Sequence, residues 1–495
     1  MRAVEGSAER APIVSASIVL GALAVLSLAT LADVRLQEVV PITAAVILWA
    51  VAYRFLLAWR NLLALLILVI LFIPIRRYTL PGNLPFNIEP YRLLVAMIIA
   101  GWLASVLVDP RVRLRRSGLE APLALFGLAI LGSQLLNSDR IAAVETYAVK
   151  QVTFFTSFVL ILFVIVSTVR TQRDVDRLLA LLVAGGSLVA AATIVEARTG
   201  FNAFNHLSGV IPLLREEVLP WVGQDGRGDR AFASAQHPIA LGAALAMLVP
   251  FSIYLGSRTG RRVWLAAGGL LTIASLATFS RTSVLMLVVM ALVYLWLRPV
   301  ETRRLWPALV PMLVVIHFLV PGTIGTIKNA FFPAGGLIAQ QRAEAGTAGS
   351  GRLADLGPGL SEWAQRPILG EGFGTRIVDG PGSNAGILDD QWLGMLLETG
   401  LVGTGALLWL FSRAIRRLAA EARQDHSSRG LLAVGLTASI YGYAVGMATF
   451  DSFAFIQVTF LLFFALGFAG VLCGVPAPRK APLLALERAR RRVLA

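Results

Sequence analysis

The sequence predicts an all-α polytopic integral membrane protein that crosses the bilayer about 14 times. Of its 495 residues, 57% are hydrophobic and 15% are charged, whereas about 25% of the residues in a soluble globular domain are charged. The apolar residues also fall in long runs, and a membrane helix needs about 20 of them. Composition and run length together exclude a disordered chain, a coiled coil and an ordinary soluble enzyme.

Fourteen apolar runs support this count, and several of them are only about 16 residues long, which leaves their ends uncertain by a few residues. The first run is too long for the apolar core of a signal peptide, so we interpret it as the first membrane helix. The runs lie at residues 12–32, 38–53, 61–75, 92–108, 120–136, 151–169, 178–196, 238–256, 263–279, 282–297, 305–320, 391–411, 431–449 and 453–474.

The positions of the basic residues predict the orientation. If the N-terminus lies in the cytoplasm and the runs alternate, every cytoplasmic segment holds at least two basic residues, and these segments hold most of the 44 in the chain. Lysine and arginine are enriched in cytoplasmic loops, so we expect both termini to be cytoplasmic. The same bias accounts for most of the net charge of +15 without a nucleic-acid partner. The single cysteine, Cys473, excludes an internal disulfide.

Two long segments, residues 198–236 and 321–389, fall on the predicted outer face. Loops of this length are usually functional or disordered, and both contain Trp, Phe, Pro and Gly, which favours folded segments with short helices. We therefore divide the chain into N-terminal membrane helices (1–197), a core that contains both outer loops (198–411), and a C-terminal helix pair with a basic cytoplasmic tail (412–495). The tail is amphipathic and is expected to contact anionic membrane lipid.

Arginines on the predicted outer face depart from the charge bias. Arg281 lies between two apolar runs with almost no loop, and Arg230 precedes the eighth run, with Arg227 in the same segment. Such residues need an anionic partner. A salt bridge to a loop carboxylate such as Asp229 is one explanation. A phosphate site is the other, because a guanidinium group pairs with phosphate oxygens through two parallel hydrogen bonds.

Two adjacent carboxylates, Asp389 and Asp390, precede the twelfth run. Adjacent residues point about 100° apart on a helix, so one carboxylate can cap the helix while the other faces a cleft as a general base. Glu398 lies further along the same run, where a polar tie between helices is a better interpretation than a catalyst.

The second outer loop contains two further motifs. The segment PILGEGFG, residues 367–374, resembles a phosphate loop, but no strand precedes it, so a tight turn is the better interpretation. Before it, SGRLADLGPGLSEWAQRP predicts a surface helix that begins near Arg352 and is interrupted at Gly357-Pro358-Gly359. None of the four histidines has metal-ligand spacing. His237 is the one nearest to the arginines, so it is retained as a candidate and no metal is expected.

Five segments resemble, in order and spacing, the O-antigen ligase and O-antigen polymerase superfamily of bacterial membrane glycosyltransferases. They are RAFASAQHPIALGAALAMLVPF (230–251), TFSRTSVLMLVVMALVYLWL (278–297), SGRLADL (350–356), PILGEGFG (367–374) and DDQWLGMLLETGLVG (389–403). In the ligase pattern a histidine precedes the two glycines that correspond to Gly400 and Gly403. Asp389 stands at that position here, which favours the polymerase or exopolysaccharide branch.

The resemblance implies an enzyme of polysaccharide biosynthesis in the cell envelope, located in the inner membrane with its active site on the extracytoplasmic face. The donor would be a glycan on undecaprenyl pyrophosphate or a similar polyprenyl pyrophosphate, and the acceptor a glycan or lipid hydroxyl. Arg281, Arg230 and Asp389 would be catalytic, and Arg352, His237, Asp390 and Arg227 would bind substrate, without a cofactor or metal.

Two alternatives remain open. A lipid-linked oligosaccharide flippase or another multi-helix transporter would place its charges in a central cavity near mid-membrane, whereas the unusual charges here lie at the outer boundary. A cell-wall polymerase of the shape, elongation and division class also uses an outer-face aspartate but typically has about ten helices.

Overall fold

The computed structural model describes residues 58–81, 88–109, 112–217, 230–303, 352–378, 383–386 and 388–474, and scattered positions between 307 and 339. The chain divides into two compact units, Met1–Leu65 and Leu66–Ala495. In the first unit the described residues are the start of α3 (Trp59–Phe72). The first two apolar runs, residues 12–32 and 38–53, and the basic tail lie outside the described residues.

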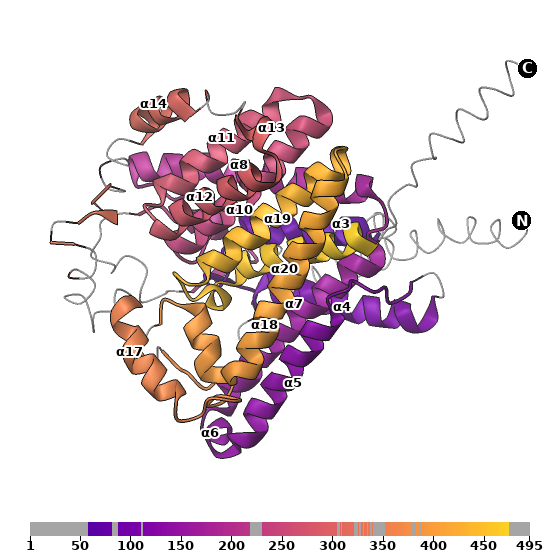
Figure 1. Ribbon diagram of the computed structural model, residues 1–495, viewed down its shortest axis with the longest axis vertical. Coiled ribbons are helices and arrows are strands. Elements are labelled where there is room, and N and C mark those ends of the chain that lie inside the picture. Colours follow the sequence, from indigo (N-terminus) through magenta and orange to yellow (C-terminus); the bar gives the residue numbers. More distant parts are fainter. Residues whose placement is uncertain are drawn as a thin grey trace, which may run out of the picture. The chain divides into compact units, whose positions relative to one another are not determined.

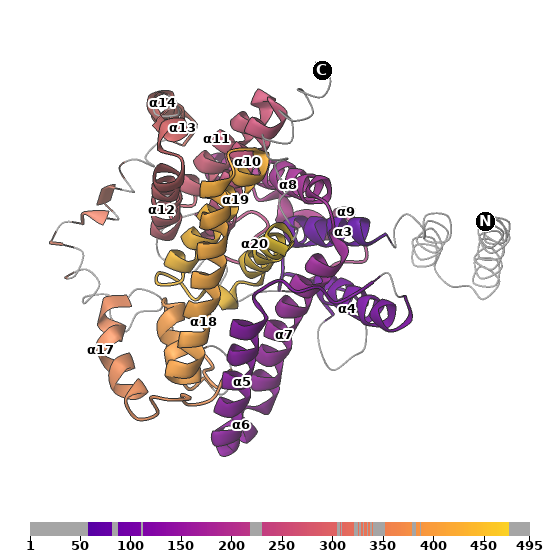
Figure 2. The same ribbon diagram turned by 45° about the vertical axis from the view of Figure 1, so that its right-hand side comes forward.

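The second unit is mostly helical, and its long helices coincide with the predicted apolar runs (Figures 1 and 2). They are α4 (Pro90–Val108), α5 (Glu120–Leu136), α7 (Glu145–Thr168), α8 (Gln172–Thr199), α10 (Pro238–Thr259), α11 (Arg262–Ala277), α12 (Arg281–Leu297), α14 (Leu309–Leu319), α18 (Gln391–Gln424), α19 (Ser428–Gly446) and α20 (Ile456–Gly474).

Six described helices are long and apolar enough to cross a membrane: α4, α7, α8, α10, α18 and α20. Four shorter apolar helices accompany them: α3, α5, α11 and α12. The described part is therefore that of a multi-pass membrane protein, while the count of 14 spans, the N-in/C-in orientation and the three-part division of the chain stay predictions.

Helix α20 lies at the centre of the second unit. Every residue from Ile456 to Leu472 is buried, as expected for a helix that is apolar on all sides. Helices α7, α10, α18 and α19 pack on it, and both views show α20 between α7 and α19.

Local sequence signals set several helix ends. Thr171 caps α8 by accepting the Asp174 N–H, and Gly200 ends α8 in the left-handed conformation. His237 caps α10 and is followed by Pro238, which needs no N–H partner at the first helical position.

The first outer segment contains η1 (Ala203–His206), α9 (Leu207–Val210) and β2 (Arg215–Glu216), which pairs antiparallel with β1 (Tyr78–Thr79). Short helices α6 (Ser138–Ala143) and α13 (Pro299–Arg303) join longer ones. This two-residue pairing is a small addition to the predicted all-α class.

The second predicted outer segment contains α17 (Arg352–Trp363), where the sequence predicted a surface helix. The expected interruption at Gly357-Pro358-Gly359 is wrong, because α17 runs through Pro358. Proline removes one backbone hydrogen bond, but the bare Gly359 packs closely on Leu393 of α18. A Cβ atom at residue 359 would lie 2.9 Å from Leu393 Cδ2, so glycine lets α17 pack closely on α18 at this point. Leu360 of α17 is 46% exposed.

Candidate active site at one end of the helices

The loop between α19 and α20, residues 447–455, contacts the starts of two other helices. The Gln391 N–H at the start of α18 donates a hydrogen bond of 2.8 Å to the Met447 carbonyl. The hydroxyl groups of Thr449 and Thr282 are 2.8 Å apart, which joins this loop to the first turn of α12. Segments that are far apart in the sequence are thereby brought together around one short turn.

The two predicted arginines belong to this assembly. Arg230 donates a hydrogen bond of 3.0 Å from Nε to the Thr278 carbonyl, in the turn between α11 and α12. Arg281 is the first residue of α12, next to the threonine that contacts the α19–α20 loop. The segment after Arg230 reaches the start of α20, directly after this loop, because the Ile456 N–H donates to Gln236 Oε1 at 3.2 Å. Both arginines are half-buried.

The adjacent carboxylates Asp389 and Asp390 have different surroundings. Asp390 Oδ1 accepts the N–H groups of Trp392 and Leu393, at 2.9 and 3.1 Å, and so caps α18. Asp389 lies near enough to Asp451 to act on it electrostatically. The sequence therefore anticipated the division between a capping carboxylate and a second one, and the structure assigns the cap to Asp390.

Asp451, in the α19–α20 loop, was missed by the sequence analysis. Its pKa is raised to about 6, first by burial and then by the charge of Asp389, while the Ala454 N–H, Arg76 and Arg376 act in the opposite direction. A carboxyl group with this pKa is a stronger base than an ordinary aspartate and is still mostly ionised at neutral pH. The one signal in the sequence was an acidic residue in a very short predicted outer loop.

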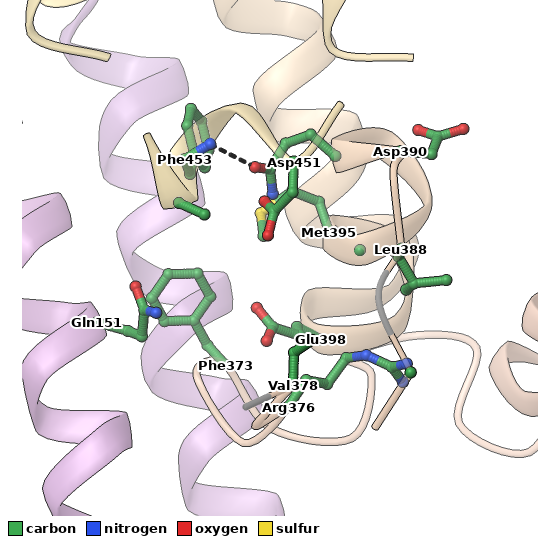
Figure 3. A pocket seen from close by; sticks show the side chains of 14 residues that line it. Gln151, Phe373, Arg376, Val378, Leu388, Asp390, Met395, Glu398, Asp451 and Phe453 are labelled. Atoms are coloured by element: carbon green, nitrogen blue, oxygen red, sulfur yellow. Dashed lines mark hydrogen bonds between the residues drawn. The ribbon is translucent and has the colours of Figure 1, made fainter. Parts of the chain in front are cut away.

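A small open pocket lies beside Asp451. Figure 3 shows the carboxyl groups of Asp451 and Glu398 directed into the same space, whereas that of Asp390 points away. The pocket thus combines hydrogen-bonding groups with apolar rings, which is the lining that sugar hydroxyls and ring faces require. Its polar lining includes Gln151, Arg376, Asp390, Gln391, Glu398 and Asp451, and its aromatic lining includes Phe373 and Phe453.

The glycine-rich segment 367–374 forms one wall of this region as a tight turn, as predicted. Gly370, Gly372 and Gly374 all have φ between 69° and 115°, a region that glycine adopts readily. The turn docks into a break in α18 at Gly400, where φ is 62° and ψ is −161°. Four backbone hydrogen bonds join the two: Glu371 to Leu397 (2.9 Å), Gly372 to Glu398 (3.3 Å), Leu401 to Pro367 (2.9 Å) and Val402 to Ile368 (3.1 Å).

This break matters because unpaired backbone groups are costly inside a membrane. The turn satisfies the N–H and carbonyl groups that the helix leaves free near Gly400. The Ser133 hydroxyl adds a hydrogen bond of 2.5 Å to the Glu398 carbonyl. Glu398 is therefore fixed at a helix break rather than within a regular helix, and it lines the pocket instead of merely tying two helices together.

Ion pairs hold Arg376 in place. Its Nη1 lies 3.0 Å from Glu371 in the glycine-rich turn and 2.9 Å from Glu362 in α17. Glu371 also pairs with Arg140 of α6 at 2.6 Å. The side chains of Arg376 and Glu371 are each 10% exposed, so this pair is largely shielded from solvent. The network links three segments beside the pocket.

The remaining predicted residues are less informative. His237 Nδ1 accepts the Ile239 N–H at 3.2 Å, and its ring lies 5.8 Å from that of Phe455, so it caps α10 near the site. Arg352 begins α17, and its side chain, like Arg227, lies outside the described part of the chain. Among the described residues, no group of three or more His, Cys, Asp or Glu could hold a metal ion.

The fold and the site define a multi-pass membrane protein with basic and acidic groups gathered at one end of its helices. A family model described as O-antigen ligase matches residues 265–408, and this confirms the resemblance to the O-antigen ligase and polymerase superfamily. The matched region includes Arg281, Asp389 and Glu398, whereas Arg230 and Asp451 lie on either side of it. No curated protein matches the chain in sequence.

Proposed function

We propose that this protein is a glycosyltransferase that moves a glycan from a polyprenyl pyrophosphate to an acceptor hydroxyl at the outer face of the cytoplasmic membrane. The family match supports membrane glycan ligase or polymerase activity. The observations that carry the finer proposal are three contacts. Arg230 binds the α11–α12 turn that precedes Arg281, Thr282 beside Arg281 contacts the α19–α20 loop, and that loop holds Asp451, on which Asp389 acts electrostatically.

In this proposal Arg281 and Arg230 bind the pyrophosphate. The bond between the anomeric carbon and the phosphate oxygen breaks, and its electron pair leaves with the pyrophosphate. Guanidinium groups stabilise that developing charge, and removal of one such contact typically lowers a rate about 10²–10³-fold. The start of α12 adds N–H groups directed toward an anion.

The acceptor hydroxyl loses its proton to the carboxylate pair as its oxygen bonds to the anomeric carbon. Asp389 was the predicted base, and its neighbour Asp451 shares the charge, so the pair acts as one acceptor of the proton. Attack opposite the leaving group inverts the anomeric configuration. The pocket beside Asp451 holds the acceptor sugar through Glu398 and Arg376. No step in this scheme uses a metal.

The test uses the full-length protein in vesicles that contain a radiolabelled glycan on undecaprenyl pyrophosphate, with an acceptor glycan added. We expect glycan-free undecaprenyl pyrophosphate to be released as the acceptor gains mass. Movement of the intact lipid-linked glycan across the bilayer without release would contradict the proposal and identify a flippase.

Gene deletion then distinguishes the polymerase branch of the superfamily from the ligase branch. Loss of long surface glycans with single units retained after gene deletion indicates a polymerase. Accumulation of full-length chains still on their lipid indicates a ligase.

A further inference from the structure

A second pocket lies at the far ends of two helices whose near ends reach the candidate site. Gln151, close to the start of α7, lines the pocket beside Asp451, whereas Val166, in the last turn of α7, lines this second pocket. Its opposite wall is the end of α20, the helix that begins directly after the loop that holds Asp451. A candidate site at the outer face therefore places the second pocket at the cytoplasmic face.

The walls of this pocket are apolar. Its volume is about 290 Å³, close to the lower end of the range for small-molecule sites, and its wall residues are Val166, Val169, Gly470, Val471 and Gly474. Residues 470 and 474 lie on one face of α20, because they are four positions apart. A Cβ atom at Gly470 would lie 2.9 Å from Val166 Cγ2, so the helices are close there, whereas Gly474 is exposed. The pocket is thus an apolar slot beside the end of α20.

Two arginines complete the lining. Arg115 and Arg116, in the segment before α5, are exposed and line the pocket. Arg417 of α18 fixes this segment against α20, because its Nη1 donates to the Ser117 carbonyl at 2.7 Å and its Nη2 donates to the Cys473 carbonyl at 3.4 Å. The two guanidinium groups are therefore held next to the slot by a backbone tie that another arginine provides.

The combination of slot and charge selects among possible occupants. The tail of this chain, residues 479–495, has six basic residues and one acidic residue, so it carries the same sign of charge as the arginines. A free phosphate ion complements the arginines but leaves the apolar walls uncovered. An amphiphile with a phosphate group and an acyl chain complements both, and basic pockets between membrane helices on the cytoplasmic side are typical sites for anionic lipid headgroups.

We propose that this pocket binds an anionic glycerophospholipid of the inner leaflet. The phosphate lies against Arg115 and Arg116, and an acyl chain lies along Val166, Val169 and Val471. The proposal goes beyond the transfer reaction, because none of the residues that line the pocket beside Asp451 lines this one.

The experiment measures lipid binding by native mass spectrometry of the full-length protein in phosphatidylcholine nanodiscs, titrated with phosphatidylglycerol as the probe. The wild type should bind one phosphatidylglycerol more tightly than any other. Arg115→Gln/Arg116→Gln should weaken this first equivalent about 25-fold, which is about fivefold for each arginine. The matched control is Arg261→Gln/Arg262→Gln, which removes two exposed arginines at the start of α11 and should keep the wild-type affinity.

A further variant tests the slot without a change of charge. A Cβ atom at Gly474 would lie 3.4 Å from the Arg116 carbonyl oxygen, which is an ordinary contact, so Gly474→Leu is accommodated and fills part of the pocket. It should weaken the first equivalent although both arginines remain. If the double arginine variant fails to fold, Arg115→Gln and Arg116→Gln should each weaken binding about fivefold.

Four results would overturn the proposal. Wild-type affinity in Arg115→Gln/Arg116→Gln would show that these arginines bind no lipid, and an equal loss in Arg261→Gln/Arg262→Gln would indicate general surface charge. Wild-type affinity in Gly474→Leu would indicate a contact with the arginines alone. Displacement of the first equivalent by inorganic phosphate as effectively as by phosphatidylglycerol would identify a site for a small anion. None of these results bears on the transfer reaction.

Discussion

The break in α18 provides the most quantitative prediction. Gly400 adopts φ of 62° and ψ of −161°, and a Cβ atom placed there would lie 2.3 Å from the Ile368 carbonyl oxygen and 2.6 Å from the Leu369 nitrogen. Because these neighbours are backbone atoms, Gly400→Ala must displace the glycine-rich turn. A residue with a side chain in this conformation costs about 1–3 kcal/mol.

Displacement of the turn also weakens the four hydrogen bonds between it and α18. Each contributes about 1 kcal/mol net, so the loss of half of them adds about 2 kcal/mol. We therefore expect Gly400→Ala to lower the free energy of unfolding by about 3–5 kcal/mol, a large part of the stability of a typical folded protein. Transfer activity should also fall, because Glu398 and Arg376 depend on the same turn.

Gly405 provides the matched control. It lies in the same helix, and nothing comes within 4 Å of a Cβ atom built there. Gly405→Ala should leave stability unchanged or raise it by up to about 1 kcal/mol, because alanine is the better helix former. The assay is unfolding of both variants in detergent, followed by tryptophan fluorescence. Equal stability of Gly400→Ala and Gly405→Ala would refute this account of the broken helix.

Four further predictions concern the charged groups. Asp390→Ala should destabilise the protein by about 1 kcal/mol, since it removes the cap of α18. Denaturation curves measure this loss, and Asp390→Asn, whose side chain can still cap the helix, is the control that should keep the wild-type stability. If Asp451 accepts the proton, the transfer rate should fall about tenfold per pH unit below pH about 6. Asp389→Asn should lower the pKa of Asp451 and shift this fall in rate to lower pH. An unshifted pH–rate profile would count against coupling between the two aspartates. The raised pKa of Asp451 also means that the folded state binds more protons than the unfolded state between pH about 4 and 6, so unfolding experiments should show stability falling as pH rises through that window. Arg376→Gln should reduce transfer and stability, because Glu371 loses an ion partner at 10% exposure, whereas Arg376→Lys should restore part of both; equal activity of all three proteins would show that the ion pairs do not position the pocket.

The sequence was sufficient for the helices and for one feature of the site. Long apolar runs predict membrane helices because burial in lipid or protein demands apolar side chains over the full length. The adjacent pair Asp389 and Asp390 predicted one capping and one separate carboxylate, because helix geometry alone separates their directions. The Asp390 cap confirms that division.

The sequence could not predict which helix starts become neighbours. In the sequence, Asp451 is an ordinary acidic residue in a short loop. Only the packing of the helices places Asp389 and the pocket beside it. Similarly, Glu398 was interpreted as a polar tie between helices. The break beside it at Gly400 could not be predicted, because it depends on a turn that lies 26 or more residues earlier in the chain. Pro358 was expected to interrupt a helix, but α17 runs through it, with Gly359 packed closely against Leu393 of α18.

The central claim is that arginine at the start of α12 stabilises a departing pyrophosphate, and the most direct measurement compares two arginines in one transfer assay. Arg281 and Arg262 are the first residues of α12 and α11. With equal amounts of folded protein in vesicles containing lipid-linked glycan, Arg281→Gln should lower the rate of pyrophosphate-lipid release about 10²–10³-fold. Arg262→Gln should retain the wild-type rate. A wild-type rate in Arg281→Gln would contradict the account.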